Sequence, residues 1–120
     1  MKKKLDLIDL SSAEIDLTSW KPLSNEDVFI CLDIEISFSN EEGTNLFYVT
    51  LATPEALSKH CEGPILVKNR TIIVVEYNYD EVKNCILEIL DQCSRATWSD
   101  SCSILQRYFQ WEYEDYSIEV

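Results

Sequence analysis

The sequence predicts an α+β domain in which two or three helices pack on a mostly antiparallel sheet of about four to six strands. Residues 28–38 alternate apolar and polar side chains with a period of two, which is typical of a strand covered on one face and wet on the other. Residues 82–93 repeat their apolar side chains every three or four positions, which predicts a helix with one buried stripe. The chain has 120 residues and no internal repeat, so we expect a single domain over residues 1–120.

The first half of the chain is expected to be mainly strand. Three segments there are expected to form strands: residues 4–10, 28–38 and 46–52. A turn at residues 40–43 would join the last two into a hairpin. Trp20 lies in the long loop between the first two of these strands and is expected to anchor that loop to the core. After the hairpin, Thr53 as N-cap and Pro54 at the first helical position predict a short helix that ends before Gly63.

The second half contributes one further strand and two helices. Residues 71–77 are rich in β-branched side chains, and their apolar run favours a central strand covered on both faces. Asn78 as N-cap, with Glu81 three residues later, predicts the start of the helix that carries the buried stripe. Thr97 with Asp100 predicts the start of a last helix in the same way.

The chain closes with a segment in which aromatic and acidic side chains mostly alternate, residues 111–116. This pattern favours a final strand, with Trp111 and Tyr113 facing inward and Glu112 and Glu114 facing water. Exposed carboxylates beside tyrosines also form a surface suited to a basic protein, because acids accept charge-assisted hydrogen bonds from Arg and Lys.

Charge narrows the class of partner. The chain has 22 Asp and Glu against 10 Lys and Arg, a formal net charge of −12 at pH 7, and both halves carry this excess equally. Phosphates would be repelled, which argues against direct nucleic-acid binding and against an anionic membrane surface. The charge therefore favours a basic partner.

The cysteines favour a cytoplasmic protein without a cofactor. There are five, none in CxxC spacing, and the apolar stretch after the N-terminal lysines is broken by Asp6 and Asp9, unlike a signal peptide. We therefore expect free thiols in a reducing compartment and no metal site. The nearest approach to a metal pair is His60 beside Cys61, where a helix end is the favoured interpretation.

Close pairs of carboxylates raise the alternative of a small metal-dependent hydrolase. Asp33 with Glu35, and Glu112 with Glu114, would each share one face of a strand. Carboxylates that face water keep ordinary pKa values, whereas an acid catalyst needs burial to raise its pKa, so we expect no enzyme activity. A second alternative is an acidic adaptor or structural interaction protein.

Several motifs resemble one known family. The run from Arg70 to Asp80 resembles the R-x-x-I-V-x-x-Y-D-Y segment of the eighth immunity-protein family of bacterial polymorphic-toxin systems. The segments 93–98, 110–116 and 53–57 resemble that family's C-x-x-x-x-W, R-W-E-F-E-D-Y and T-P-x-W-L motifs. The resemblance covers about residues 45–116. The departures from the family pattern are Ala56, Asn78, Gln110 and Tyr113.

The resemblance implies a cytoplasmic bacterial antitoxin encoded beside a toxin that is delivered by contact-dependent growth inhibition or a secretion system. Such proteins bind the C-terminal domain of the toxin and block it. Many of these toxins are nucleases, whose active faces must be basic to hold phosphates, and an acidic chain would be steered onto such a face. The acids would pair with toxin Lys and Arg, and the final tyrosine would add a contact. The expected toxin-binding residues are Asp33, Glu35, Glu41, Glu42, Glu112, Glu114, Asp115 and Tyr116.

Overall fold

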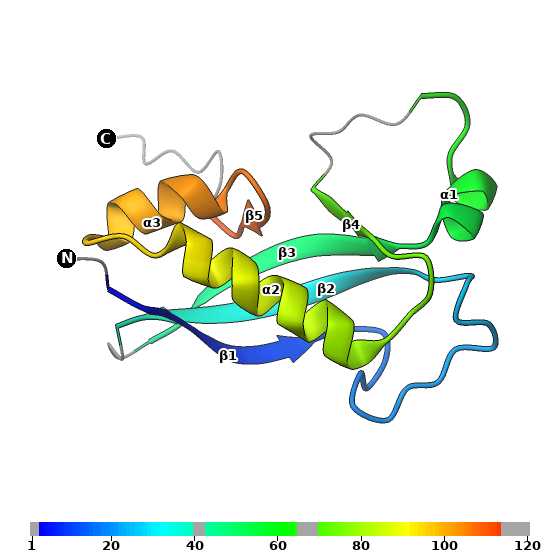
Figure 1. Ribbon diagram of the computed structural model, residues 1–120, viewed down its shortest axis with the longest axis horizontal. Coiled ribbons are helices and arrows are strands. Elements are labelled where there is room, and N and C mark those ends of the chain that lie inside the picture. The colour runs from blue at the N-terminus through cyan, green and yellow to red at the C-terminus, as the bar shows by residue number, and fades with distance from the viewer. Residues whose placement is uncertain (1–2, 40–42, 65–69, 114–120) are drawn as a thin grey trace.

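The computed structural model describes residues 3–39, 43–64 and 70–113 (Figure 1). Its strands are β1 (Leu5–Ser11), β2 (Phe29–Phe38), β3 (Asn45–Ala52), β4 (Thr71–Ile73) and β5 (Gln110–Trp111). Its helices are α1 (Pro54–His60), α2 (Tyr79–Cys93) and α3 (Trp98–Leu105). These elements confirm the predicted α+β class. None of the helices in the described ranges is long and apolar enough to cross a membrane.

The five strands form one mixed sheet. β1, β2 and β3 pair antiparallel in chain order, and β4 joins the far edge of β3 in parallel orientation. β5 pairs antiparallel with the same edge of β3, at Phe47 and Tyr48, whereas β4 pairs with residues 50–52. The two short strands β4 and β5 thus share one edge of the hairpin, both beside β3.

Apolar burial holds α2 and α3 against one face of this sheet (Figure 1). The side chains of β2 that point to this face are all buried, as are Phe47, Val49 and Leu51 of β3, as expected. The predicted stripe of α2 faces them through Val82 and Ile86, and further along the helix through its last two turns. The inward side chains of the strands and the apolar stripe of α2 therefore form a single core.

Each helix begins at the residue expected to cap it. The side chains of Thr53, Asn78 and Thr97 accept hydrogen bonds from backbone N–H groups three residues later, at 3.3, 3.1 and 3.1 Å. These bonds satisfy donors that the first helical turn leaves without a partner.

Thr53 also joins α1 to the start of β2. Its buried Oγ1 accepts a second hydrogen bond from the backbone N–H of Val28 at 3.0 Å, and its own backbone N–H donates to the Val28 carbonyl at 2.9 Å. The next residue, Phe29, stacks on His60 at the end of α1, with ring centroids 4.6 Å apart. Thr53 therefore sets where α1 lies relative to the strand ends.

Aromatic contacts hold the remaining segments in place. Trp98 of α3 packs edge-on against Phe38, Phe47 and Trp111, which connects the sheet, α3 and β5. In the loop before β2, Trp20 packs edge-on against a tyrosine that precedes α2 and against the core, which confirms its expected anchoring role.

Two expectations are wrong in detail. The predicted central strand is short and lies at an edge: β4 ends at Ile73, which is 58% exposed, and Val75 is 76% exposed. The backbone N–H of Val74 still donates to the carbonyl of Ala52 at 3.0 Å, but the backbone N–H of Tyr77 donates at 2.7 Å to the carbonyl of Asn25 in the loop before β2, so this end of the segment bonds to that loop and not to β3.

The predicted final strand over residues 111–116 is also short: β5 ends at Trp111, residues 112–113 form a turn, and residues 114–116 lie outside the described residues. Tyr113, which follows the end of the strand, was expected inward but is 49% exposed and packs against the ring of Trp111.

We predict that Thr53→Ala lowers the free energy of unfolding by about 1–3 kcal/mol, because it removes a helix cap and leaves the buried N–H of Val28 without a partner. Urea denaturation measures the change. Thr53→Ser, which keeps the hydroxyl, serves as the control and should lose less than half as much. An equal loss in both variants would assign the effect to the methyl group instead.

Candidate functional site: the open face of the sheet

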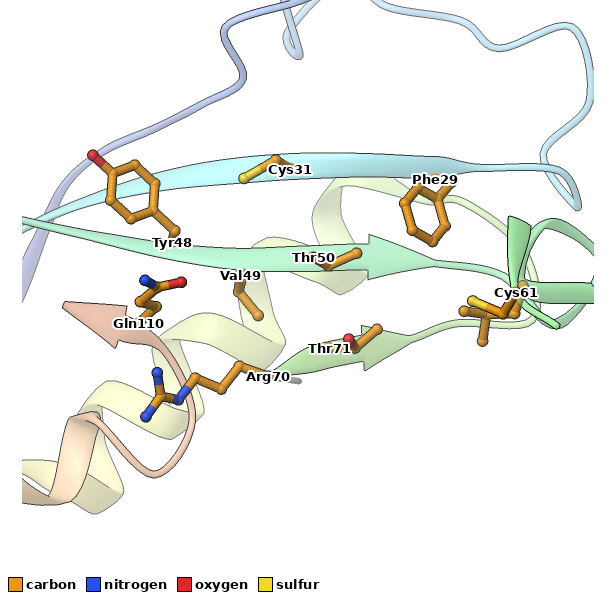
Figure 2. A pocket seen from close by; sticks show the side chains of 10 residues that line it. Phe29, Cys31, Tyr48, Val49, Thr50, Cys61, Arg70, Thr71 and Gln110 are labelled. Carbon is orange, nitrogen blue, oxygen red and sulfur yellow. The ribbon is translucent and has the colours of Figure 1, made fainter. Parts of the chain in front are cut away.

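The face of the sheet opposite α2 and α3 carries the polar half of the alternation, and we call it the open face (Figures 1 and 2). At the centre of this face, the pairing registers arrange side chains in three adjacent rows across the strands: Asp9–Glu35–Leu46, Ser11–Asp33–Tyr48–Gln110 and Cys31–Thr50–Thr71. Glu112 extends the first row, because its backbone N–H donates to the carbonyl of Leu46 at 3.0 Å. Four carboxylates therefore gather in two adjacent rows.

Three of the expected toxin-binding residues come together here. Asp33 and Glu35 lie on β2, and Glu112 follows β5, two strands away across the sheet. The expected residues Glu41, Glu42, Glu114, Asp115 and Tyr116 lie outside the described residues. Sequence reasoning missed Asp9 and Tyr48 as members of this face. The alternation of their own strands contains a signal for both, but only the pairing places them beside Asp33 and Glu35.

The electrostatics of the open face are most visible at Tyr48. Burial raises the pKa of Tyr48, and the nearby charges of Asp33 and Glu112 raise that pKa further. Both carboxylates therefore act on the same hydroxyl, one from each side of β3. The Tyr48 hydroxyl therefore stays protonated and neutral, and it can form hydrogen bonds at a place where the negative charges attract a cation.

Asp33 is one of the two partly buried acids among the four carboxylates of these rows. Partial burial raises the pKa of its carboxyl group, and within the described part of the chain this carboxylate has no hydrogen bond or ion pair. A partly buried carboxylate without a partner costs free energy when ionised, so a cation from outside would be stabilising.

Cys31 is exposed but is a poor nucleophile. Burial of the sulfur raises the pKa of the Cys31 thiol, and the charges of Asp33 and Glu14 raise that pKa further. The reactive thiolate is therefore scarce at neutral pH. Among the residues that the structure describes, no group of three or more His, Cys, Asp and Glu could hold a metal ion.

A hollow of about 370 Å³ opens beside Tyr48 (Figure 2). The small side chains of the third row make its floor, with Tyr48 and Gln110 at one end and Phe29 at the other (Figure 2). Its lining residues are Phe29, Cys31, Tyr48, Val49, Thr50, Leu57, Cys61, Arg70, Thr71 and Gln110. The hollow exists because a row of short side chains lies between longer ones.

The charged face and the hollow make the open face the candidate binding surface of this protein. Comparison with known proteins shows the class of the protein. The family model described as Immunity protein 8 matches residues 5–116, nearly the whole chain. The chain therefore belongs to the Immunity protein 8 family, and it is an immunity protein against a toxin. The match confirms the resemblance and extends it into β1 and β2. No curated protein and no solved structure matches the chain.

We predict that Asp33→Asn lowers the pKa of Cys31 and of Tyr48, because it removes a negative charge that raises both. The rate of Cys31 alkylation by iodoacetamide, followed by peptide mass spectrometry across a pH series, measures the thiol directly. Glu35→Gln, two residues along the same strand face, is the matched control and should shift the profile less. Unchanged profiles in the Asp33 variant would contradict this account.

The raised pKa of Asp33 also predicts how stability changes with pH. A carboxyl group whose pKa is raised by folding contributes stability below its ordinary value of 3.8, and this contribution is lost as the pH rises through the raised value. Asp33→Asn should therefore be more stable than the parent protein near pH 7, with a difference that shrinks toward about pH 3. Thermal unfolding across this range measures it. A less stable variant at neutral pH would show that Asp33 has a stabilising partner.

Proposed function

We propose that this immunity protein neutralises a nuclease toxin in the cytoplasm by covering the toxin's basic, nucleic-acid-binding surface with the open face. The observation that carries the proposal is the grouping of Asp33, Glu35 and Glu112 on one side of the sheet in a chain of net charge −12. A nuclease must present cationic groups to hold phosphates, so its active surface has the complementary sign. The proposal includes no catalytic step: the toxin is blocked by binding.

Electrostatic attraction between such surfaces would act mainly on the rate of association. Steered protein pairs associate at up to about 10⁸–10⁹ M⁻¹s⁻¹ at low salt, against about 10⁵–10⁶ M⁻¹s⁻¹ without steering. Fast capture suits an antitoxin, because a toxin that is not captured continues to act. Glu41, Glu42, Glu114, Asp115 and Tyr116 remain proposed contacts on the basis of the sequence.

The test uses the toxin domain encoded beside this chain. Replacing Asp33, Glu35 and Glu112 together by Lys should slow association at least about 10-fold at low salt and flatten its salt dependence, because steering is lost. Stopped-flow mixing measures the rate, and growth rescue in co-expressing cells measures protection. The control reverses three exposed acids outside the rows, Glu26, Glu76 and Glu88, and so changes the net charge equally.

Equal rates for the two triple variants would overturn the role of the open face. The nuclease assignment has its own readout, since the free toxin domain should degrade DNA or RNA and should stop doing so at about one equivalent of immunity protein. Inhibition by a small fraction of an equivalent would indicate turnover and would contradict inhibition by binding. A toxin that leaves nucleic acids intact would overturn the nuclease part alone.

A further inference from the structure

The hollow beside Tyr48 is polarised. At one end, Tyr48 lies opposite Asp33 across β2 and β3, and the charges of Asp33 and Glu112 both act on its hydroxyl. Arg70 lines the same end but on the β4–β5 side, with Gln110 between it and Tyr48 in Figure 2. A cationic group in the hollow is therefore attracted toward Tyr48 and Asp33 on the β2 side, away from Arg70.

The shape of the hollow favours a long, thin side chain. Its floor of Cys31, Thr50 and Thr71 presents short side chains across three strands, and the wall at Tyr48 is an aromatic ring. The volume of about 370 Å³ is at the lower end for a small-molecule pocket and is open to the surface that faces a partner. A protruding side chain of that partner fits such a hollow, as anchors do at protein interfaces.

We propose that the hollow seats one arginine side chain of the toxin, whose guanidinium stacks on Tyr48 and donates hydrogen bonds to the carboxylate of Asp33. Asp33 and Tyr48 are directly opposite each other on β2 and β3, so one planar group can reach both. Arginine suits this pair better than lysine, because its planar fork both stacks on an aromatic ring and binds a carboxylate through two N–H groups. This inference rests on the proposed function and names the side chain that the open face recognises.

The test fills the hollow without changing any charge. Thr50→Phe places an aromatic ring on its floor, at a strand position where phenylalanine is well tolerated. The affinity for the toxin domain should fall on the order of 100-fold, mainly through faster dissociation, while salt-dependent association persists. Thr50→Val leaves the hollow open and should stay within about 3-fold of the parent protein. Circular dichroism confirms that each variant is folded.

A double-mutant cycle identifies the arginine. Each toxin arginine is changed to Ala and to Lys and is measured against the parent protein and against Asp33→Asn. For one toxin arginine, both the Ala and the Lys substitution should weaken binding to the parent protein. This weakening should shrink at least about 5-fold when Asp33 is already Asn. Binding should also protect Cys31 from alkylation, whereas Cys85 on α2 should keep its reactivity.

The two proposals fail differently. If reversal of the three acids slows association but Thr50→Phe binds as well as Thr50→Val, the arginine seat is wrong and the open face remains the interface. If no toxin arginine couples to Asp33, the seat is also wrong. If neither the acid reversals nor Thr50→Phe changes binding, the proposed function fails together with it.

Discussion

One-sided burial is the constraint on which the rest of this structure depends. α2 and α3 both pack on the same face of the sheet, and the buried side chains of β2, β3 and the helices form one core there. Strand geometry then requires every second side chain to point to the other side, where water remains. That face is polar in this chain, and all the charges in the two adjacent rows that hold Asp33 and Glu35 are carboxylates.

The accumulation of acids on that face has an energetic consequence. Partial burial raises the pKa of Asp33, and the nearby charges of Asp33 and Glu112 add to the effect of burial in raising the pKa of Tyr48. Charges in this state are less favourable in the free protein than in a complex that supplies cations. Under the proposed function, the same features that cost stability in the free protein would provide free energy for recognition of the toxin.

Several features of the fold could be predicted because they depend on neighbours in the chain. The N-caps at Thr53, Asn78 and Thr97 are local hydrogen bonds, and the stripe of α2 is a local periodicity. The strand at residues 71–77 could not be predicted correctly. Its apolar run favoured a central strand, but β4 ends at Ile73, and the backbone of Tyr77 bonds to the loop before β2, a segment remote in sequence.

The sequence by itself determined which side chains share a face: the alternation in β2 places Asp33 and Glu35 on the wet side whatever the partner strand. It could not determine their neighbours, because registers that differ by two residues keep every apolar side chain in the core. Only the tertiary structure decided that Asp33 lies opposite Tyr48 and that Glu112 reaches the same face from the end of the chain. The hollow has the same origin, since it exists only where three short side chains from three strands fall into one row.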